Sequence, residues 1–105
     1  MITIWKYPVS LEDSFEVEMP EAAYILAVQM QGDTPQMWAI VDTNRPRKKF
    51  TFRLFGTGHP MEHTTAWGKK SRIPDWLVDY RGTFQIRGLV FHLFMMPPHI
   101  GADDS

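Results

Sequence analysis

The residue types best suited to chemistry stand in the segment GTGHP, residues 56–60. Gly56 and Gly58 permit positive φ and let a ligand approach the backbone closely, and successive N–H groups in such a turn can bind an anion. Thr57 and His59 add side chains that can hydrogen-bond a phosphate. A plain turn, with a proline that ends the preceding strand, explains the same residues and is the interpretation we favour. The segment lacks the spacing and the following helix of a phosphate-binding P-loop.

Two clusters of basic residues, at 45–49 and 69–72, lie on either side of this segment in the sequence. Cations meet phosphates and aromatic rings stack on bases, so basic and aromatic side chains together suit a small anionic, nucleotide-like ligand. A net charge of −1 is unlike that of a typical nucleic-acid-binding domain, so nucleic acid is an alternative that the composition does not favour. A solvated loop, or a docking patch for an acidic protein, explains the same residues. Besides Gly56, Thr57, Gly58 and His59, the candidate ligand-binding residues are Arg45, Arg47, Lys48, Lys49, Trp67, Lys69, Lys70 and Arg72.

Catalytic and metal-binding constellations find little support. The chain has no cysteine, which excludes thiol nucleophiles, zinc–thiolate sites and disulfides. His59 and His63 are four residues apart, but Pro60 argues against the helix that would place both imidazoles on one face. His92 lies among apolar residues, where a buried, hydrogen-bonded histidine is expected. We therefore predict no catalytic residue, no metal site and no cofactor, with a small hydrolase or nuclease that uses His59 as a third alternative.

The elements that position these residues are strands. Apolar and polar residues alternate with period two, as in the strand with Phe15, Val17 and Met19 on one face and Glu16 and Glu18 on the other. This pattern predicts an all-β, mainly antiparallel fold, a compact β-sandwich or small open barrel of six or seven strands. The single β domain spans residues 1–96, with a polar tail at 97–105. The strands are expected at 2–9, 15–19, 23–31, 36–43, 49–55, 79–86 and 89–96, with a turn at 31–36, a second at Gly88, and a short helical or irregular excursion at about 61–78.

The charges are segregated along the chain. Residues 1–42 carry seven acidic residues and one basic residue, for a net −6, whereas residues 43–87 carry ten basic and three acidic residues, for a net +7. If this segregation survives folding, one face is cationic and attracts an anionic ligand or an acidic partner. The first residues do not form a signal peptide, and the longest apolar run is too short to span a bilayer. We therefore expect no membrane association and a cytoplasmic protein.

Six short motifs occur in order along the chain. They are WKYP (5–8), MPxAxxILxVQxQ (19–31), WAxVD (38–42), GTGHP (56–60), GTFQ (82–85) and LVFHLF (89–94). Together they resemble a family of small proteins of unknown function that bacteriophages and prophages encode. The resemblance implies a phage setting, and hence the host cytoplasm, and it supplies no catalytic residue.

Three functions follow from these observations. The leading hypothesis is a phage-encoded accessory binding protein, which binds a host protein or sequesters a small anionic ligand and so antagonises host defence. Its ligand-binding form predicts that GTGHP, the basic loop at 45–49 and Trp67 line one pocket, either within one copy or completed by another subunit. The second hypothesis is a self-associating structural or virion-associated β module, a homo-oligomer. The third is the small hydrolase or nuclease.

Overall fold

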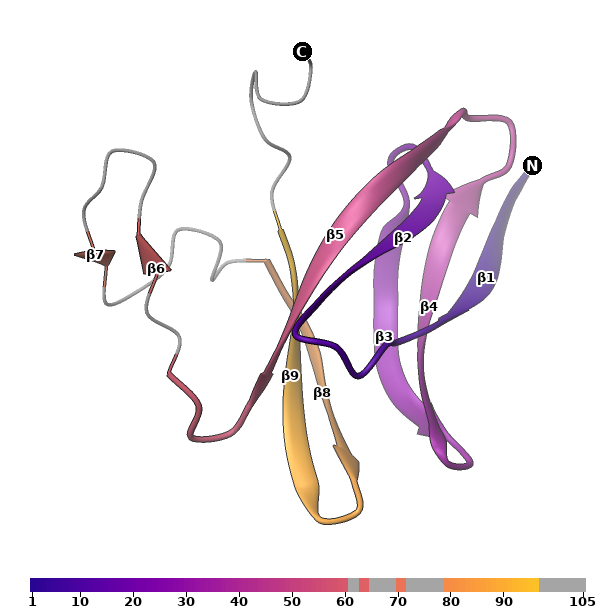
Figure 1. Ribbon diagram of the computed structural model, residues 1–105. Coiled ribbons are helices and arrows are strands. Elements are labelled where there is room, and N and C mark those ends of the chain that lie inside the picture. Colours follow the sequence, from indigo (N-terminus) through magenta and orange to yellow (C-terminus); the bar gives the residue numbers. More distant parts are fainter. Residues whose placement is uncertain (61–62, 65–69, 72–78, 97–105) are drawn as a thin grey trace.

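The computed structural model describes residues 1–60, 63–64, 70–71 and 79–96. In this part of the chain seven long strands form two antiparallel sheets, and a separate pair of two-residue strands forms a third ladder (Figure 1). The strands are β1 (Ile2–Pro8), β2 (Ser14–Pro20), β3 (Tyr24–Gln31), β4 (Thr34–Asp42), β5 (Arg47–Gly56), β6 (His63–Thr64), β7 (Lys70–Ser71), β8 (Tyr80–Ile86) and β9 (Leu89–Met95). All seven predicted strands are present, with ends that differ by at most two residues.

The two sheets form a sandwich and do not close into a barrel. One sheet has the order β1-β4-β3 and the other has the order β2-β5-β9-β8. Every pairing is antiparallel. The predicted all-β, mainly antiparallel class is therefore confirmed, and the sandwich is the form that it takes.

Alternation along the strands builds one core between the sheets. Met37, Ala39 and Val41 of β4 point inward and are buried, while the residues between them are partly exposed. In β2 and β5 the inward residues include Phe15 and Phe52, whose rings stack with centroids 5.4 Å apart. Successive side chains of a strand point to opposite faces of the sheet. The alternation of apolar and polar residues in the sequence is therefore sufficient to identify these core residues.

Two tight turns close the hairpins. Gly32 begins the two-residue loop between β3 and β4 with a φ of 63°, as a type II′ turn requires. Arg87 and Gly88 between β8 and β9 both have positive φ, 52° and 80°, which is the pattern of a type I′ turn. The turn predicted at 31–36 is shorter than expected, because Pro35 already belongs to β4.

The two sides of the sandwich differ. On one side β3 and β8 pack against each other although they belong to different sheets, and a Cβ placed on Gly82 would lie only 2.7 Å from the Cβ of Val28. On the other side β1 and β2 are the edge strands of their sheets. There the Arg47 guanidinium lies over the Trp5 ring, 5.9 Å from its centroid. Burial raises the pKa of the nearby Tyr7 phenol, and the positive charge of Arg47 partly opposes the shift.

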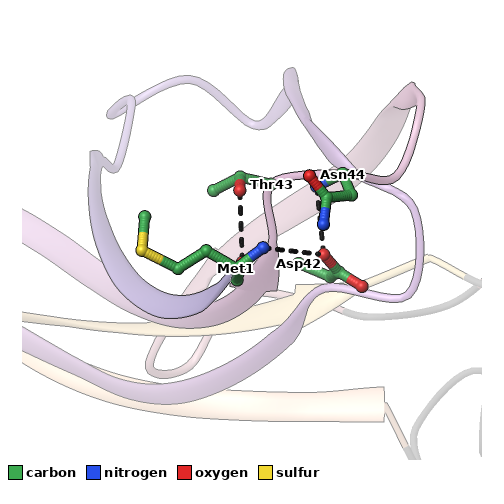
Figure 2. Close-up of polar contacts among 4 residues, drawn as sticks. All are labelled: Met1, Asp42, Thr43 and Asn44. Carbon is green, nitrogen blue, oxygen red and sulfur yellow. Dashed lines mark hydrogen bonds and ion pairs between the residues drawn. The ribbon is translucent and has the colours of Figure 1, made fainter.

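The start of the edge strand β1 is tied to the end of β4 (Figure 2). The Met1 amino group lies 3.6 Å from an Asp42 carboxylate oxygen, and the Thr43 hydroxyl donates to the Met1 carbonyl over 3.2 Å. The same Asp42 oxygen accepts from the Asn44 N–H over 3.0 Å. These contacts hold β1 in register at the edge of its sheet.

Two predicted features lie wholly or largely outside the described residues: the tail at 97–105, and the excursion at about 61–78, of which only 63–64 and 70–71 are described. The described residues contain no helix long and apolar enough to cross a membrane.

Candidate functional site

The GTGHP segment forms a hydrogen-bonded turn where β5 ends. Thr57 N–H donates to the Val90 carbonyl over 3.0 Å, and His59 N–H donates to the Gly56 carbonyl over 3.0 Å. Gly58 has a φ of 89°, which favours glycine there. Because two backbone N–H groups of the turn already donate to carbonyls, they are not free to bind an anion. The plain turn accounts for this geometry, and a ligand-binding role for these residues stays a prediction.

Gly56 provides room for the His59 ring. A Cβ placed on Gly56 would lie 2.8 Å from Cε1 and 2.9 Å from Nδ1 of that ring. Gly56 has no positive φ, so its lack of a side chain serves close approach rather than an unusual backbone conformation. The imidazole of His59 therefore lies against Gly56, the last residue of β5.

A chain of hydrogen bonds joins this turn to two strands, β9 and β8. The His92 ring bonds the Thr57 hydroxyl through Nε2 over 2.7 Å and the Thr83 hydroxyl through Nδ1 over 3.0 Å. Thr83 in turn bonds the Tyr80 hydroxyl. His92 is thus hydrogen-bonded as predicted, but it is half-buried rather than buried. Tyr80 could not be recognised from the sequence as part of this chain of hydrogen bonds. A bulge between Tyr80 and Gly82 places its side chain on the same face of the sheet as that of Thr83, which strict alternation would not do.

Aromatic rings adjoin this polar chain on the outer face of the same sheet. Phe55 and Phe94 are buried and meet edge to face, with centroids 5.9 Å apart. Tyr80 meets Phe94 in the same way over 5.6 Å, and the Arg53 guanidinium lies 5.0 Å from the centroid of Phe55. The polar chain and the rings together pack this end of the sheet, which is a structural role.

The predicted basic loop at 45–49 is only partly a loop: Arg45 precedes β5, whereas 47–49 are its first residues, at the opposite end of the strand from the GTGHP turn. β5 has 10 residues, so at about 3.3 Å per residue its ends lie about 30 Å apart. The two segments therefore do not line one pocket within a single copy of the chain, and a pocket that another subunit completes stays a prediction. Of the remaining candidates, Trp67, Lys69 and Arg72 lie outside the described residues, and Lys70 falls in β7.

Several cations of this loop have partners within the fold. The Arg45 guanidinium lies 3.2 Å from a Glu21 carboxylate oxygen, and Lys49 stands directly opposite Glu18 in the register of β2 and β5. The acidic and basic segments are thus neighbours, which weakens the cationic face that their separation along the chain suggested.

A groove lies along the free edge of β2. Its volume is about 560 Å³, and both faces of the strand contribute to it. Apolar side chains form much of the lining, and three carboxylates stand along it. The lining residues are Pro8, Val9, Ser10, Glu12, Phe15, Glu16, Val17 and Glu18. The sequence pattern predicted Glu16 and Glu18 only as the solvent-exposed face of a strand, because the loop before β2 that completes the groove is positioned by tertiary packing.

The bonds at the two ends of β2 show which of its backbone groups face this groove. Leu54 N–H donates to the Asp13 carbonyl over 3.0 Å. Glu21 N–H donates to the Pro46 carbonyl over 2.8 Å. With the antiparallel register, these bonds assign the odd-numbered residues of β2 to the ladder with β5. The N–H and C=O groups of even-numbered residues such as Glu16 therefore point to the free edge, where none of the described strands pairs with them.

The outer face of the three-stranded sheet is a second exposed surface. Four large apolar side chains gather on it: Ile2, Ile4, Tyr24 and Leu26, exposed by 73, 54, 63 and 45%. A hollow of about 390 Å³ between Ile2, Thr3, Ile4 and Ile40 lies among them. Contiguous exposed apolar surface of this kind marks protein interaction sites.

Comparison with known proteins gives a family. The described residues contain no cluster of three His, Cys, Asp or Glu side chains that could hold a metal. No curated protein and no solved structure matches the chain. Residues 1–101 match a family described as a domain of unknown function, DUF7352. Because this match covers nearly the whole chain, the protein belongs to the DUF7352 family.

Proposed function

We propose that the protein is a phage-encoded accessory binding protein that acts in the host cytoplasm by binding a host protein through the β2 groove. The groove is the observation that supports this proposal, because an apolar lining beside unpaired strand backbone suits a segment of another protein. Its carboxylates repel anions, so a protein partner is favoured over a small anionic ligand. Blocking a host defence protein needs affinity alone, and antagonism of host defence is the use we infer.

A tryptophan in the groove tests this function. The tagged protein is used to recover a partner from a lysate of defence-active cells, and the purified partner is titrated by calorimetry. Ser10→Trp fills the groove and is expected to weaken binding at least about tenfold, because contacts at the centre of an interface dominate its affinity. Leu89→Trp, at the tip of the β8–β9 hairpin, is the matched control and keeps wild-type affinity. Unchanged binding by Ser10→Trp would exclude the groove as the binding site.

Self-association is a second candidate, favoured by the outer face of the three-stranded sheet. Ile4 and Ile40 form a cross-strand pair at the middle of this face. Lys6 lies on one side of that pair and Asp42 on the other. A two-fold axis through the pair places Lys6 of each copy over Asp42 of the other, while the apolar side chains meet at the centre. Such self-complementarity is what a symmetric dimer interface requires.

We expect the wild-type chain to form dimers in sedimentation equilibrium and Ile4→Asp to be monomeric, because a carboxylate at the centre of the apolar contact is desolvated without a partner. Lys6→Asp should also weaken the dimer, and adding Asp42→Lys should restore it. Leu89→Asp is the control for an exposed apolar residue elsewhere and should remain dimeric. A wild-type protein that stays monomeric at millimolar concentration would rule out this association.

A further inference from the structure

We propose that the β2 groove takes a basic, extended segment of the partner protein, which adds to the free edge of β2 as a fifth strand of its sheet. This inference rests on the proposed binding function and specifies the chemistry of its partner. Three features support it: unpaired backbone, flanking carboxylates and an apolar lining on the opposite face of the strand.

The backbone of β2 determines the mode of binding. Even-numbered residues direct their N–H and C=O groups to the free edge, and β2 spans seven residues, Ser14–Pro20. β2 pairs with β5 without interruption over that length. Its free edge is therefore already in an extended conformation before a segment binds. A strand that pairs there gains main-chain hydrogen bonds irrespective of its sequence. Pro20 lacks an N–H and limits how far the pairing extends in that direction.

The side chains determine the sequence that fits. Glu16 and Glu18 lie on the outer face of the sheet, two residues apart, so basic residues at alternate positions of an added strand would stand beside them. On the inner face Phe15 and Val17 contribute to the groove together with Val9. The intervening residues of the segment are therefore apolar. A pattern of alternating basic and apolar residues satisfies both faces.

The two glutamates are not equivalent. A basic residue, Lys49, stands opposite Glu18 in the register, whereas the uncharged Thr51 stands opposite Glu16. Glu16 is thus the principal carboxylate for the added strand. The free edge of β1 offers a useful contrast, since its hydrogen bonds with β4 direct the backbone of Ile2, Ile4 and Lys6 outward and β1 itself carries no carboxylate side chain. A basic segment therefore prefers β2 over β1.

The test uses a fluorescent peptide of the sequence Gly-Lys-Val-Lys-Val-Lys-Gly, blocked at both ends, and measures binding by anisotropy at low ionic strength. We expect saturable binding that weakens as salt is added, because the ion pairs are exposed. The peptide with Glu in place of Lys should not bind. A peptide N-methylated at alternate residues on its pairing edge should lose binding, because each methyl group replaces a hydrogen-bond donor of the added strand.

Two substitutions at one position separate charge from backbone. Glu16→Gln removes the carboxylate alone and is expected to weaken the peptide about two- to fivefold, the range for one exposed ion pair. Glu16→Pro also removes the N–H at the free edge while leaving the ladder with β5 intact, and it should weaken the peptide at least about tenfold. Asp33→Asn, in the β3–β4 turn, is the control for a lost carboxylate and should bind as the wild type does. Circular dichroism is used to check that each variant is folded.

The outcomes are distinguishable from failure of the proposed function. No peptide binding, equal binding of the acidic peptide, or wild-type affinity of folded Glu16→Pro would overturn strand addition by a basic segment. If Ser10→Trp abolishes binding of the purified host protein while Glu16→Pro and Glu16→Gln leave it unchanged, the groove binds its partner and this inference is wrong. Parallel losses for the peptide and the host protein would support both.

Discussion

Replacing Phe52 with alanine is expected to lower the free energy of unfolding by about 3–5 kcal/mol, the range for a large aromatic side chain removed from a core. Phe52 has no exposed surface. Its ring stacks on Phe15 with an interplanar angle of 16°, and its strand neighbours in the register are Phe15 on one side and Met95 on the other. The side chain thus lies at the centre of the four-stranded sheet, where the surrounding strands cannot collapse into the space it leaves.

Urea denaturation followed by circular dichroism measures this effect as a lower midpoint at an unchanged slope. The control is Leu89→Ala, because Leu89 is 59% exposed at a hairpin tip and its truncation should change stability by no more than about 0.5 kcal/mol. A loss of less than about 1 kcal/mol for Phe52→Ala would contradict a single core shared by the two sheets.

Replacing Gly82 with alanine should destabilise the protein through a clash between the two sheets. The new methyl group would lie 2.7 Å from the Cβ and 2.9 Å from the Cγ2 of Val28. Overpacking of this kind costs about 1–3 kcal/mol. The loss of backbone freedom in the unfolded chain offsets about 0.4–1 kcal/mol of it, since Gly82 has no positive φ and alanine fits its backbone. We therefore expect a net loss of about 1–2 kcal/mol in the free energy of unfolding.

A double-mutant cycle isolates the contact. Val28→Gly removes both atoms that the methyl group would meet, so Gly82→Ala should cost nothing in that background, and the coupling energy should be about 0.5–3 kcal/mol. Gln85→Ala, at an exposed position of β8, provides the reference for an ordinary substitution in the same strand. If Gly82→Ala lowers the free energy of unfolding equally in both backgrounds, its methyl group does not clash with Val28, and this contact does not set the distance between β3 and β8.

Local patterns were sufficient to predict the fold class and the strands. Side chains in a strand alternate between two faces, so the inward parity of Met37, Ala39 and Val41 is visible in the sequence before any partner strand is known. Turns are equally local, because the positive φ at Gly32 and Gly88 suits glycine whatever surrounds it. The GTGHP segment likewise forms a turn, with positive φ at Gly58, while its ligand-binding role stays a prediction.

The candidate site was harder to predict, because it depends on which strands become neighbours. The bulge that brings Tyr80 to the face of Thr83 and His92 interrupts the period on which sequence analysis relies. Likewise, the basic residues at 45–49 and the GTGHP turn stand at opposite ends of β5 and are kept apart by this strand. Two segments at opposite ends of a strand are close in the sequence but far apart in space, because the strand is extended.

The all-β class, the inward residues and the turns can be predicted from the amino-acid sequence, since each follows from the conformational preferences of a few consecutive residues. The tertiary structure alone decided that β1 and β2 join different sheets, that the acidic β2 lies against the basic β5, and that a groove follows the free edge of β2. These features depend on pairing between residues distant in the chain. Many such pairings satisfy the same alternation, and packing of the complete core selects among them.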